Sequence, residues 1–562
     1  MKRTQCKRQK SGSIVLACLT TAILAACGGG DDAPPTENTM NTPPTQPVDK
    51  PASVVRPACK DCSAVDSNTY AGSGVGVWQS INTTGAAIDM PIHISGLDGQ
   101  DVTLVFTNET DTARAMPMLP LTTSYSPSVV ASELRWNDGS EALKRRIQEF
   151  NHTGWAALAG KKGSAPDAST QSAPHRAAVN DVRIWYHADD TARKATLRAQ
   201  HTTTDGTTVN FWVENGEYVS SRITSAILDV LGDGFVAPGK IYDMLKSVGG
   251  PLWGGHNNYS DLIAGDGQPI DIVILNFDGN GSGIGMTGYF SARNAFKREP
   301  KFNPYSNESV SLYLDAEWLY GASATRLRPM LSTMAREAMH MQNFYRRGVK
   351  HGLQKMFDPW LEEATAMMME DFASESMGPS SAYNAIRDRR FPDYIGYKAG
   401  SYSCSLVEWT PLAASCDSFS VSGSFGGFLN RQLGADFYKN LLNTMLDGVD
   451  GTDSVKALDQ AIRSVAPASG MGEQLRRFSA TAGSLMKAPS PAGYGFPSRT
   501  VEQFVLPSID PQVQLPYRTL TQSVPAMLQS YASLPVVRQA IKGTHSETVK
   551  VPAGTSLSVV IQ

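Results

Sequence analysis

The sequence lacks the features of membrane, nucleic-acid-binding and fibrous proteins. Its 562 residues carry 50 lysines and arginines against 53 acidic residues, so no basic excess indicates a nucleic acid partner. Hydrophobic residues make up 41% of the chain and charged residues 18%, which excludes wholesale disorder. At roughly 100 to 200 residues per domain, this length predicts two to four domains.

No apolar run near the N-terminus is long enough to cross a membrane. Residues 14–26 form a short apolar run after a basic cluster, which predicts a signal peptide over residues 1–26. The run ends in Leu-Ala-Ala before Cys27, which resembles the lipobox of bacterial lipoproteins and implies a lipid anchor on Cys27. Residues 27–57 contain many prolines and no aromatic residue, so we expect a disordered tether. The expected location is the bacterial outer membrane, facing the periplasm or exposed at the surface.

Cysteines are few, seven in all. Cys6 and Cys18 belong to the signal, and the lipid anchor uses Cys27. The remaining four are an even number in an oxidising compartment, which predicts a disulfide between Cys404 and Cys416. The other pair favours a small disulfide loop over half of a zinc site, because no second CxxC or nearby histidine pair completes a ligand set. This pair is Cys59 and Cys62.

The order of patterns along the chain predicts an α+β protein. Short β-rich runs separated by turn residues predict a β-rich N-terminal domain over residues 58–205. From residue 206 the pattern changes to helices around one buried strand at 271–277, which predicts a second domain ending near residue 400. Residues 401–562 predict a mainly helical domain that ends in a β-hairpin over 548–562.

The candidate chemistry lies on a helix predicted from Pro329 to Gly348, a stretch that no breaker interrupts. Its positions 336, 337 and 340 match the HExxH zinc motif, in which two histidines four residues apart share one helix face. Arg336 replaces the first histidine, Glu337 occupies the glutamate position and His340 is the second histidine.

A second helix is predicted to begin at Pro359, with Asp358 as its N-cap. The separation between His340 and Glu363 lets a loop reverse the chain, so that Glu363 can face the first helix. This is the arrangement of the third ligand in glutamate-type zinc peptidases.

Taken together, these segments resemble the hyicolysin family of zinc metallopeptidases over roughly residues 205–445. The resemblance implies a thermolysin-like metallopeptidase fold, zinc as cofactor, and hydrolysis of a protein or peptide substrate by a zinc-bound water. It also implies that Glu337 is the catalytic residue and that His340 and Glu363 are metal ligands. The motifs that carry it are Tyr305-Ser-Asn-Glu308, the helix from Glu337 to Gly348, Trp360-Leu-Glu-Glu363-Ala and Gly423-Ser-Phe-Gly-Gly-Phe-Leu429.

Arg336 departs from the family pattern at the first ligand position. Arginine has no lone pair and keeps its charge, so it cannot ligate a cation and repels one. We therefore expect weak or absent zinc binding, with Arg336 paired to Glu337 or Glu363, and peptide hydrolysis weak or lost. Two alternatives stay open: an active zinc peptidase in which His256 or His351 substitutes as ligand, and a surface adhesin or binding protein that uses the fold as a scaffold.

Other motifs carry less information. Asp278 opens a run with the oxygen spacing of half a calcium loop, but Tyr289 stands at the last ligand position, so a glycine-rich turn is predicted. Residues 284–290 predict an edge strand suited to binding an extended peptide, and residues 140–150 predict a charged helix without obvious chemistry. The methionines of the two central helices predict core packing. They are Met334, Met339, Met341, Met367, Met368 and Met369.

Overall fold

The chain from Ala52 to Gln562 forms one compact unit in the computed structural model. The expected signal peptide, Cys27 and most of the expected tether lie outside the described residues. No helix within the described ranges is long and apolar enough to cross a membrane. The described residues are 54–121, 138–155, 176–256, 259–279, 281, 285–352, 355–376, 384–396, 400–411, 416–443, 453–501 and 504–562.

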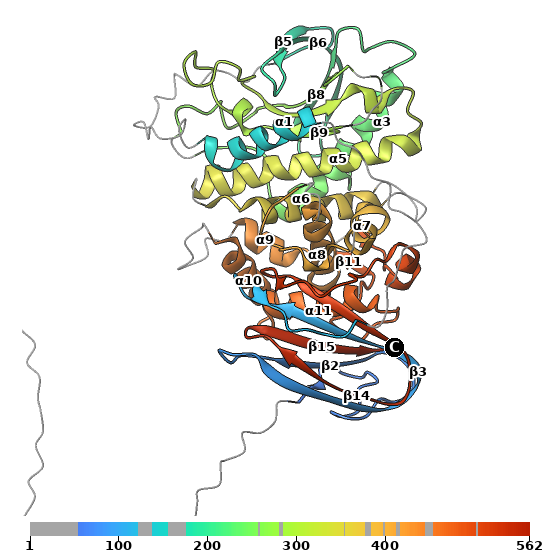
Figure 1. The fold of residues 1–562 in the computed structure, drawn as a ribbon. Coiled ribbons are helices and arrows are strands. Elements are labelled where there is room, and N and C mark those ends of the chain that lie inside the picture. Colours follow the sequence, from blue (N-terminus) through green and yellow to red (C-terminus); the bar gives the residue numbers. More distant parts are fainter. Residues whose placement is uncertain are drawn as a thin grey trace, which may run out of the picture. The chain divides into compact units, whose positions relative to one another are not determined.

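A six-stranded mixed sheet carries the region of the predicted site (Figure 1). Its order is β5-β6-β7-β8-β10-β9, in which β7, β8 and β10 are parallel and the other neighbours antiparallel. Every residue of β8 and β10 is buried, as expected for parallel strands covered on both faces. The strands are β5 (Val182–Tyr186), β6 (Ala192–Thr202), β7 (Thr208–Glu214), β8 (Ile270–Leu275), β9 (Gly288–Phe290) and β10 (Val310–Asp315).

A second sheet of five antiparallel strands joins the two ends of the described chain. Its order is β1-β2-β15-β3-β14, and α11 packs against β3, β14 and β15. The strands are β1 (Arg56–Pro57), β2 (Gly76–Ile81), β3 (Ile88–Asn108), β14 (Ser533–Val551) and β15 (Thr555–Ile561).

This sheet corrects three expectations. The predicted β-hairpin over residues 548–562 is wrong, because β14 and β15 do not pair with each other. Both strands pair with β3, which lies between them. The strands expected in one β-rich domain over residues 58–205 are divided between the two sheets. The tether was expected to reach residue 57, but Arg56 and Pro57 pair with β2 and Val55 is buried. Strand pairing is decided by contacts far apart in sequence, which local patterns do not report. The boundaries expected at residues 206 and 400 stay predictions.

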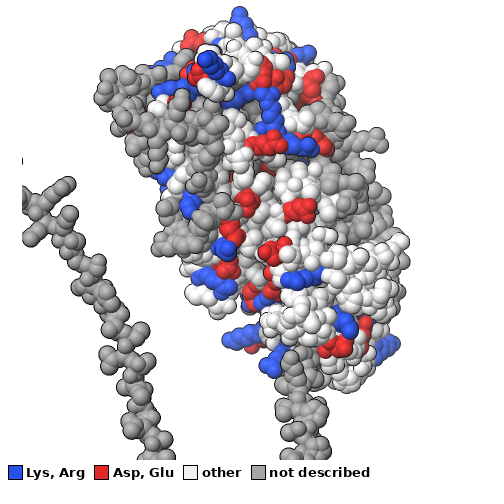
Figure 2. Space-filling view, turned by 60° about the vertical axis from the view of Figure 1, so that its left-hand side comes forward, with Lys and Arg blue, Asp and Glu red and all other residues white. Residues whose placement is uncertain are grey.

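Helices fill the region between the two sheets (Figure 1). Charged residues of both signs intermingle on the face drawn in Figure 2. The helices are α1 (Asp138–Glu149), α3 (Ser225–Val236), α4 (Ile241–Gly249), α5 (Ala324–Asn343), α6 (Pro359–Ser376), α7 (Phe391–Gly396), α8 (Ser418–Leu433), α9 (Asp436–Asn443), α10 (Ser454–Val465) and α11 (Met471–Ser484). Two short pairs, β4 (Arg114–Ala115) with β13 (Met527–Leu528) and β11 (Arg499–Val501) with β12 (Phe504–Leu506), complete the strands.

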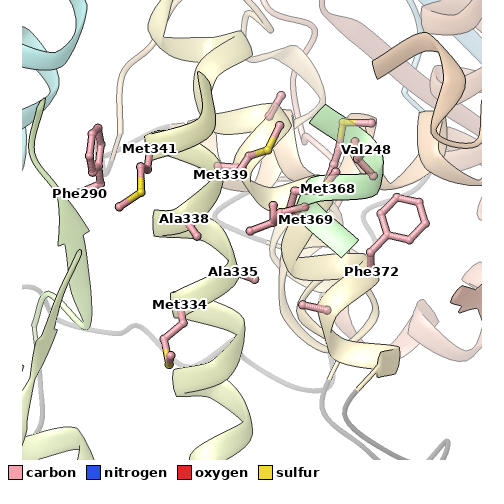
Figure 3. Close-up of a cluster of buried hydrophobic side chains, with 14 of the residues drawn as sticks. Val248, Phe290, Met334, Ala335, Ala338, Met339, Met341, Met368, Met369 and Phe372 are labelled. Carbon is pink, nitrogen blue, oxygen red and sulfur yellow. The ribbon is translucent and has the colours of Figure 1, made fainter. Parts of the chain in front are cut away.

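The two predicted central helices are α5 and α6. Helix α5 begins at Ala324, five residues before the predicted start at Pro329, and continues as a π-helical segment, Phe344–Val349. Helix α6 begins at Pro359 as predicted, and the Asp358 carbonyl accepts hydrogen bonds from two N–H groups of its first turn. The predicted methionine packing is confirmed, since all six methionines are buried. Figure 3 shows Met334, Met339, Met341, Met368 and Met369 in this cluster.

Both predicted disulfides are present. Cys59 pairs with Cys62 and Cys404 pairs with Cys416. The second bridge holds the segment before α8 against the segment that follows α7.

Candidate active site

The predicted site residues line one pocket, whose cavity volume is about 70 Å³. Helix α5 contributes Arg336, Glu337 and His340, and α6 contributes Glu362 and Glu363. The remaining walls come from β9, from the segment just before α6, and from α1 with the π-helical turn that follows it, Phe150–Gly154. The structure therefore brings together all the residues that the HExxH-like motif and the second helix predicted.

Arg336 forms a buried ion pair with its chain neighbour. Its Nε and Nη2 donate to Glu337 Oε1 at 3.0 and 2.7 Å. Its Nε also lies 4.0 Å from Glu370 Oε1, and Arg390 approaches the same carboxylate at 3.4 Å. Burial alone would lower the pKa of Arg336, but the carboxylates of Glu337, Glu370 and Glu363 raise it above its usual value. Arg336 is therefore a fixed positive charge within the site.

Glu337 has a second partner on the edge strand. Its Oε2 accepts a hydrogen bond from the Phe290 N–H of β9 at 2.9 Å. Both oxygens of Glu337 are thus engaged, and its side chain is only 4% exposed.

His340 lies between two carboxylates of α6. Its Nδ1 is 2.9 Å from Glu362 Oε1, and its Nε2 is 3.6 Å from Glu363 Oε2. Burial would lower the pKa of His340, but Glu363 and Glu362 raise it well above its usual value. Burial would likewise raise the pKa of Glu363, but His340, followed by Arg336 and a hydrogen bond from Gln148, lowers it to about 2. The two carboxylates of α6 therefore favour the protonated form of His340 in the metal-free protein.

The residues present do not fit the zinc ion that the family resemblance implies. Zinc needs deprotonated ligands, and catalytic sites usually supply three from the protein. Here Arg336 holds the first ligand position, and its guanidinium has no lone pair to offer a metal. His340 Nε2 and Glu363 Oε2 lie 3.6 Å apart, so two of the three ligand positions in the family pattern are filled by residues that can ligate.

Neither proposed substitute histidine lines the pocket. His256 Nε2 lies 2.8 Å from the Ile263 carbonyl oxygen. His351 follows the π-helical segment, and burial together with nearby arginines and lysines lowers its pKa. Nothing in the geometry brings either one to the position that Arg336 occupies.

Helix α1 supplies pocket residues that the sequence did not reveal. Gln148 Nε2 donates to Glu363 Oε1 at 2.8 Å. Asn151 Nδ2 donates to the Phe290 carbonyl at 3.0 Å, and its Oδ1 accepts from the Ala292 N–H at 2.8 Å. Lys144 lines the same pocket, where burial and Arg336 lower its pKa to about 7. No local signal pointed to these residues, since residues 140–150 match no catalytic motif.

A separate carboxylate cluster lies at the carboxyl ends of β8 and β10. Asp278, Asp315 and Glu317 bring ligand atoms within 4.8 Å of one another, the one such group in the described part of the chain. Burial, reinforced by the charges of Asp278 and Glu317, raises the pKa of Asp315 to about 7. The predicted glycine-rich turn starts here, although Asn280 and residues 282–284 lie outside the described residues.

The chain matches known protein families and one curated relative. Residues 189–562 match the Peptidase M30 family, and residues 57–121 match a domain of unknown function, DUF8571. The chain is 25% identical over 315 residues to the neutral metalloprotease ShpI of Staphylococcus hyicus. That match covers 55% of this chain and 64% of the relative, so the chain spans less than two thirds of the relative's length.

Solved structures give weaker similarities. An M1 zinc metallopeptidase from Deinococcus radiodurans is 12% identical, with a TM-score of 0.27 over 51% of this chain and 50% of that one. A mutant of the Deinococcus radiodurans enzyme is 8% identical, with a TM-score of 0.26 over 75% and 72% of the two chains. Scores this low do not establish a shared fold.

Proposed function

Because the chain belongs to the Peptidase M30 family, we propose that it is an exported metallopeptidase homologue whose zinc centre is replaced by buried ion pairs. In this proposal peptide hydrolysis is weak or lost, and the pocket binds a peptide or protein ligand. The observation that supports this proposal most directly is the Arg336–Glu337 ion pair, which places a permanent cation at a metal-ligand position. In the family pattern Glu337 stands at the position of the base, and His340 and Glu363 stand at ligand positions.

The ion pairs support loss of hydrolysis as well as loss of metal. A metallopeptidase needs its glutamate free to accept a proton and its histidine neutral to ligate. Here Glu337 is bonded to Arg336 and to the edge strand, and the carboxylates of Glu362 and Glu363 on either side of His340 raise its pKa. The pocket and its walls nevertheless persist, so binding is the function that the geometry supports best.

Metal content measured beside activity tests this proposal. After dialysis against buffered zinc, we expect the purified protein to hold no stoichiometric zinc by elemental analysis and not to cleave casein. The Arg336→His variant is expected to bind zinc, with at most one ion per chain. This expectation concerns metal content and does not require casein cleavage. Arg463→His, on the exposed face of α10, controls for nonspecific binding by a new histidine. Stoichiometric zinc in the native protein would reject the proposal and favour an active peptidase.

We further propose that the mature chain is a lipoprotein anchored through Cys27 in the outer membrane. The basic cluster, short apolar run and Leu-Ala-Ala before Cys27 support this. Mass spectrometry of the mature N-terminus should find a lipidated Cys27, and Cys27→Ser should release the protein from the membrane fraction. A Cys27→Ser protein that stays with the outer membrane would contradict this anchor.

A further inference from the structure

The carboxylate cluster at the carboxyl ends of β8 and β10 lies outside the pocket. The ligand atoms of Asp278, Asp315 and Glu317 lie within 4.8 Å of one another, and none of the three residues lines the pocket. Oxygens bound to one Ca²⁺ ion at about 2.3 to 2.6 Å can lie up to about 5 Å apart. The spacing of the cluster therefore allows all three side chains to reach one ion.

One oxygen of the cluster is buried and has no hydrogen-bond donor. Glu317 is 8% exposed, and its Oε2 has no partner among the residues that the structure describes. Its Oε1, by contrast, accepts from the Gly281 N–H at 2.9 Å and from Asn276 Nδ2 at 3.2 Å. A buried carboxylate oxygen without a partner costs free energy, so Glu317 Oε2 requires a donor or a cation.

Asp315 is held in place by the main chain of two segments. Its Oδ1 accepts from the Phe277 N–H at 3.1 Å and from the Glu317 N–H at 3.4 Å, where Asp315 caps the 3-10 turn Ala316–Leu319. Asp315 is itself buried. The bonds to Asp315 and Glu317 therefore join the turn that follows β8 to the 3-10 turn that follows β10, and they fix both carboxyl groups at the cluster.

The two buried carboxyl groups of the cluster have no basic partner. Neither Asp315 nor Glu317 forms an ion pair with any residue that the structure describes. The two acidic residues joined to the cluster by the hydrogen bonds of Asn276 and Tyr320 differ, because each has an arginine partner. A cation is thus lacking at the cluster and not around it. The two arginine pairs are Glu214 with Arg193 and Glu217 with Arg222, at 3.5 and 2.9 Å.

The ligand atoms of the cluster suit a hard cation. All three side chains are carboxylates, whose oxygens bind Ca²⁺ or Mg²⁺, whereas structural zinc sites use histidine and cysteine. Mg²⁺ requires near-ideal octahedral geometry at about 2.0 to 2.1 Å, but Ca²⁺ accepts six to eight oxygens in a flexible arrangement. Asp278 is exposed, so water can reach the cluster and complete such a shell.

The sequence around Asp278 agrees with this ion. The run that begins at Asp278 has the oxygen spacing of half a calcium loop and lacks the acidic residue expected at its end, where Tyr289 stands. Asp315 and Glu317 belong to a later segment of the chain, and they bring carboxylates to Asp278 that the run itself lacks.

We propose that Asp278, Asp315 and Glu317 bind one calcium ion, which joins the turn after β8 to the 3-10 turn that precedes α5. None of these ligands belongs to α5 or α6, so the site does not depend on Arg336 or on whether the pocket holds zinc. A ligand that binds only the folded chain raises its stability, so calcium should stabilise this end of the sheet.

Calorimetric titration of the purified protein, stripped of metal by a chelator, tests the proposal. The probes are calcium chloride and, separately, magnesium chloride. We expect one calcium ion per chain with a dissociation constant no weaker than about 10⁻³ M, the upper end for calcium sites of extracellular modules. Magnesium should bind at least about tenfold more weakly, because three carboxylates and an open side do not impose octahedral geometry.

Two variants remove one ligand charge each. Asp278→Asn changes an exposed side chain, so it should fold as the native protein does, and Glu317→Gln keeps the side-chain shape. Each should weaken calcium binding at least about tenfold. Asp229→Asn, at an exposed aspartate of α3, is the matched control and should bind calcium as the native protein does. In thermal unfolding, calcium should raise the Tm of the native protein and of Asp229→Asn by more than that of Asp278→Asn.

Three results would overturn the proposal. The first is a native protein that does not bind calcium, and the second is calcium binding that Asp278→Asn and Glu317→Gln leave unchanged. The third is loss of calcium binding in Glu363→Gln but not in Glu317→Gln, which would place the ion in the pocket. Tighter binding of magnesium than of calcium would overturn the identity of the ion. Zinc content decides the proposed function separately and leaves this inference unaffected.

Discussion

The guanidinium of Arg336 lies against the carboxylate of Glu337, although the two residues are neighbours on one helix. Adjacent helical side chains point about 100° apart, so such residues do not ordinarily face each other. The pair forms because the arginine side chain is long enough to turn back along α5, between Glu337 and the Glu370 carboxylate of α6. It places a permanent positive charge where the family pattern has a metal ligand.

Removal of this charge should destabilise the protein. Arg336→Met keeps much of the side-chain volume but leaves Glu337 and Glu370 with one cation fewer inside the protein. Breaking a buried pair from one side costs about 3 to 5 kcal/mol, so we expect the free energy of unfolding to fall by about that amount. Urea denaturation measures it. Arg463→Met removes an exposed pair on α10 and should leave the unfolding midpoint nearly unchanged. Equal midpoints for native protein and Arg336→Met would show that the pair contributes nothing.

The His340–Glu363 pair predicts a stability maximum at mildly acidic pH. The pKa of Glu363 is lowered to about 2, so its contribution is present above its unfolded value of about 4.3 and is lost as pH falls toward 2. The pKa of His340 is raised, so its contribution is complete below about 6.5 and is lost as pH rises through the folded value.

The free energy of unfolding, measured between pH 5 and pH 9, tests the contribution of His340. Above about 6.5 the native protein should lose up to about 1.4 kcal/mol per pH unit relative to His340→Gln, which cannot titrate. His93→Gln, at an exposed histidine of β3, should keep the native slope. If native protein and His340→Gln show the same slope, His340 is not protonated in the folded state.

Lys144 should react as a neutral amine near physiological pH. Burial and then the Arg336 charge lower its pKa to about 7, so a large share of its side chains is uncharged at pH 7.5. We expect the pH profile of acylation by a small reagent, followed by peptide mass spectrometry, to have its midpoint near 7 at Lys144. Arg336→Met should move that midpoint upward because a repelling cation is gone. The exposed Lys542 provides the internal reference for reagent concentration. A midpoint that does not respond to Arg336→Met would contradict the assigned cause.

The sequence predicted the centre of the site better than its surroundings. The start of α6 follows a local signal, Pro359, and the span from His340 to Glu363 lets the two helices face each other. The start of α5 was predicted five residues too late, because Pro329 lies inside the helix. The sequence left open whether Arg336 pairs with Glu337 or Glu363, because the answer depends on the conformation of a long side chain. The placement of β3 between β14 and β15 depended on pairing between chain ends. Helix α1 could not be assigned to the pocket because Gln148 and Asn151 belong to no motif.

Asn151 offers the most direct test of how the edge strand is closed. Asn151→Ala removes the carboxamide and frees the Phe290 carbonyl and the Ala292 N–H. We expect a modest loss of stability, about 1 to 3 kcal/mol, because two main-chain groups lose their partner. We also expect a gain in affinity for an extended peptide capped at both ends, measured by fluorescence anisotropy, because the freed groups can pair with a peptide main chain.

The control for this gain lies in the same π-helical turn. Thr153 donates only to the Glu149 carbonyl of its own turn, so Thr153→Ala should leave capped-peptide binding unchanged. The peptide is capped at both ends, so its binding to Asn151→Ala reports on main-chain pairing with the edge strand. Unchanged affinity in a folded Asn151→Ala protein would mean that another part of the pocket wall, and not this carboxamide, keeps extended peptides off the edge strand.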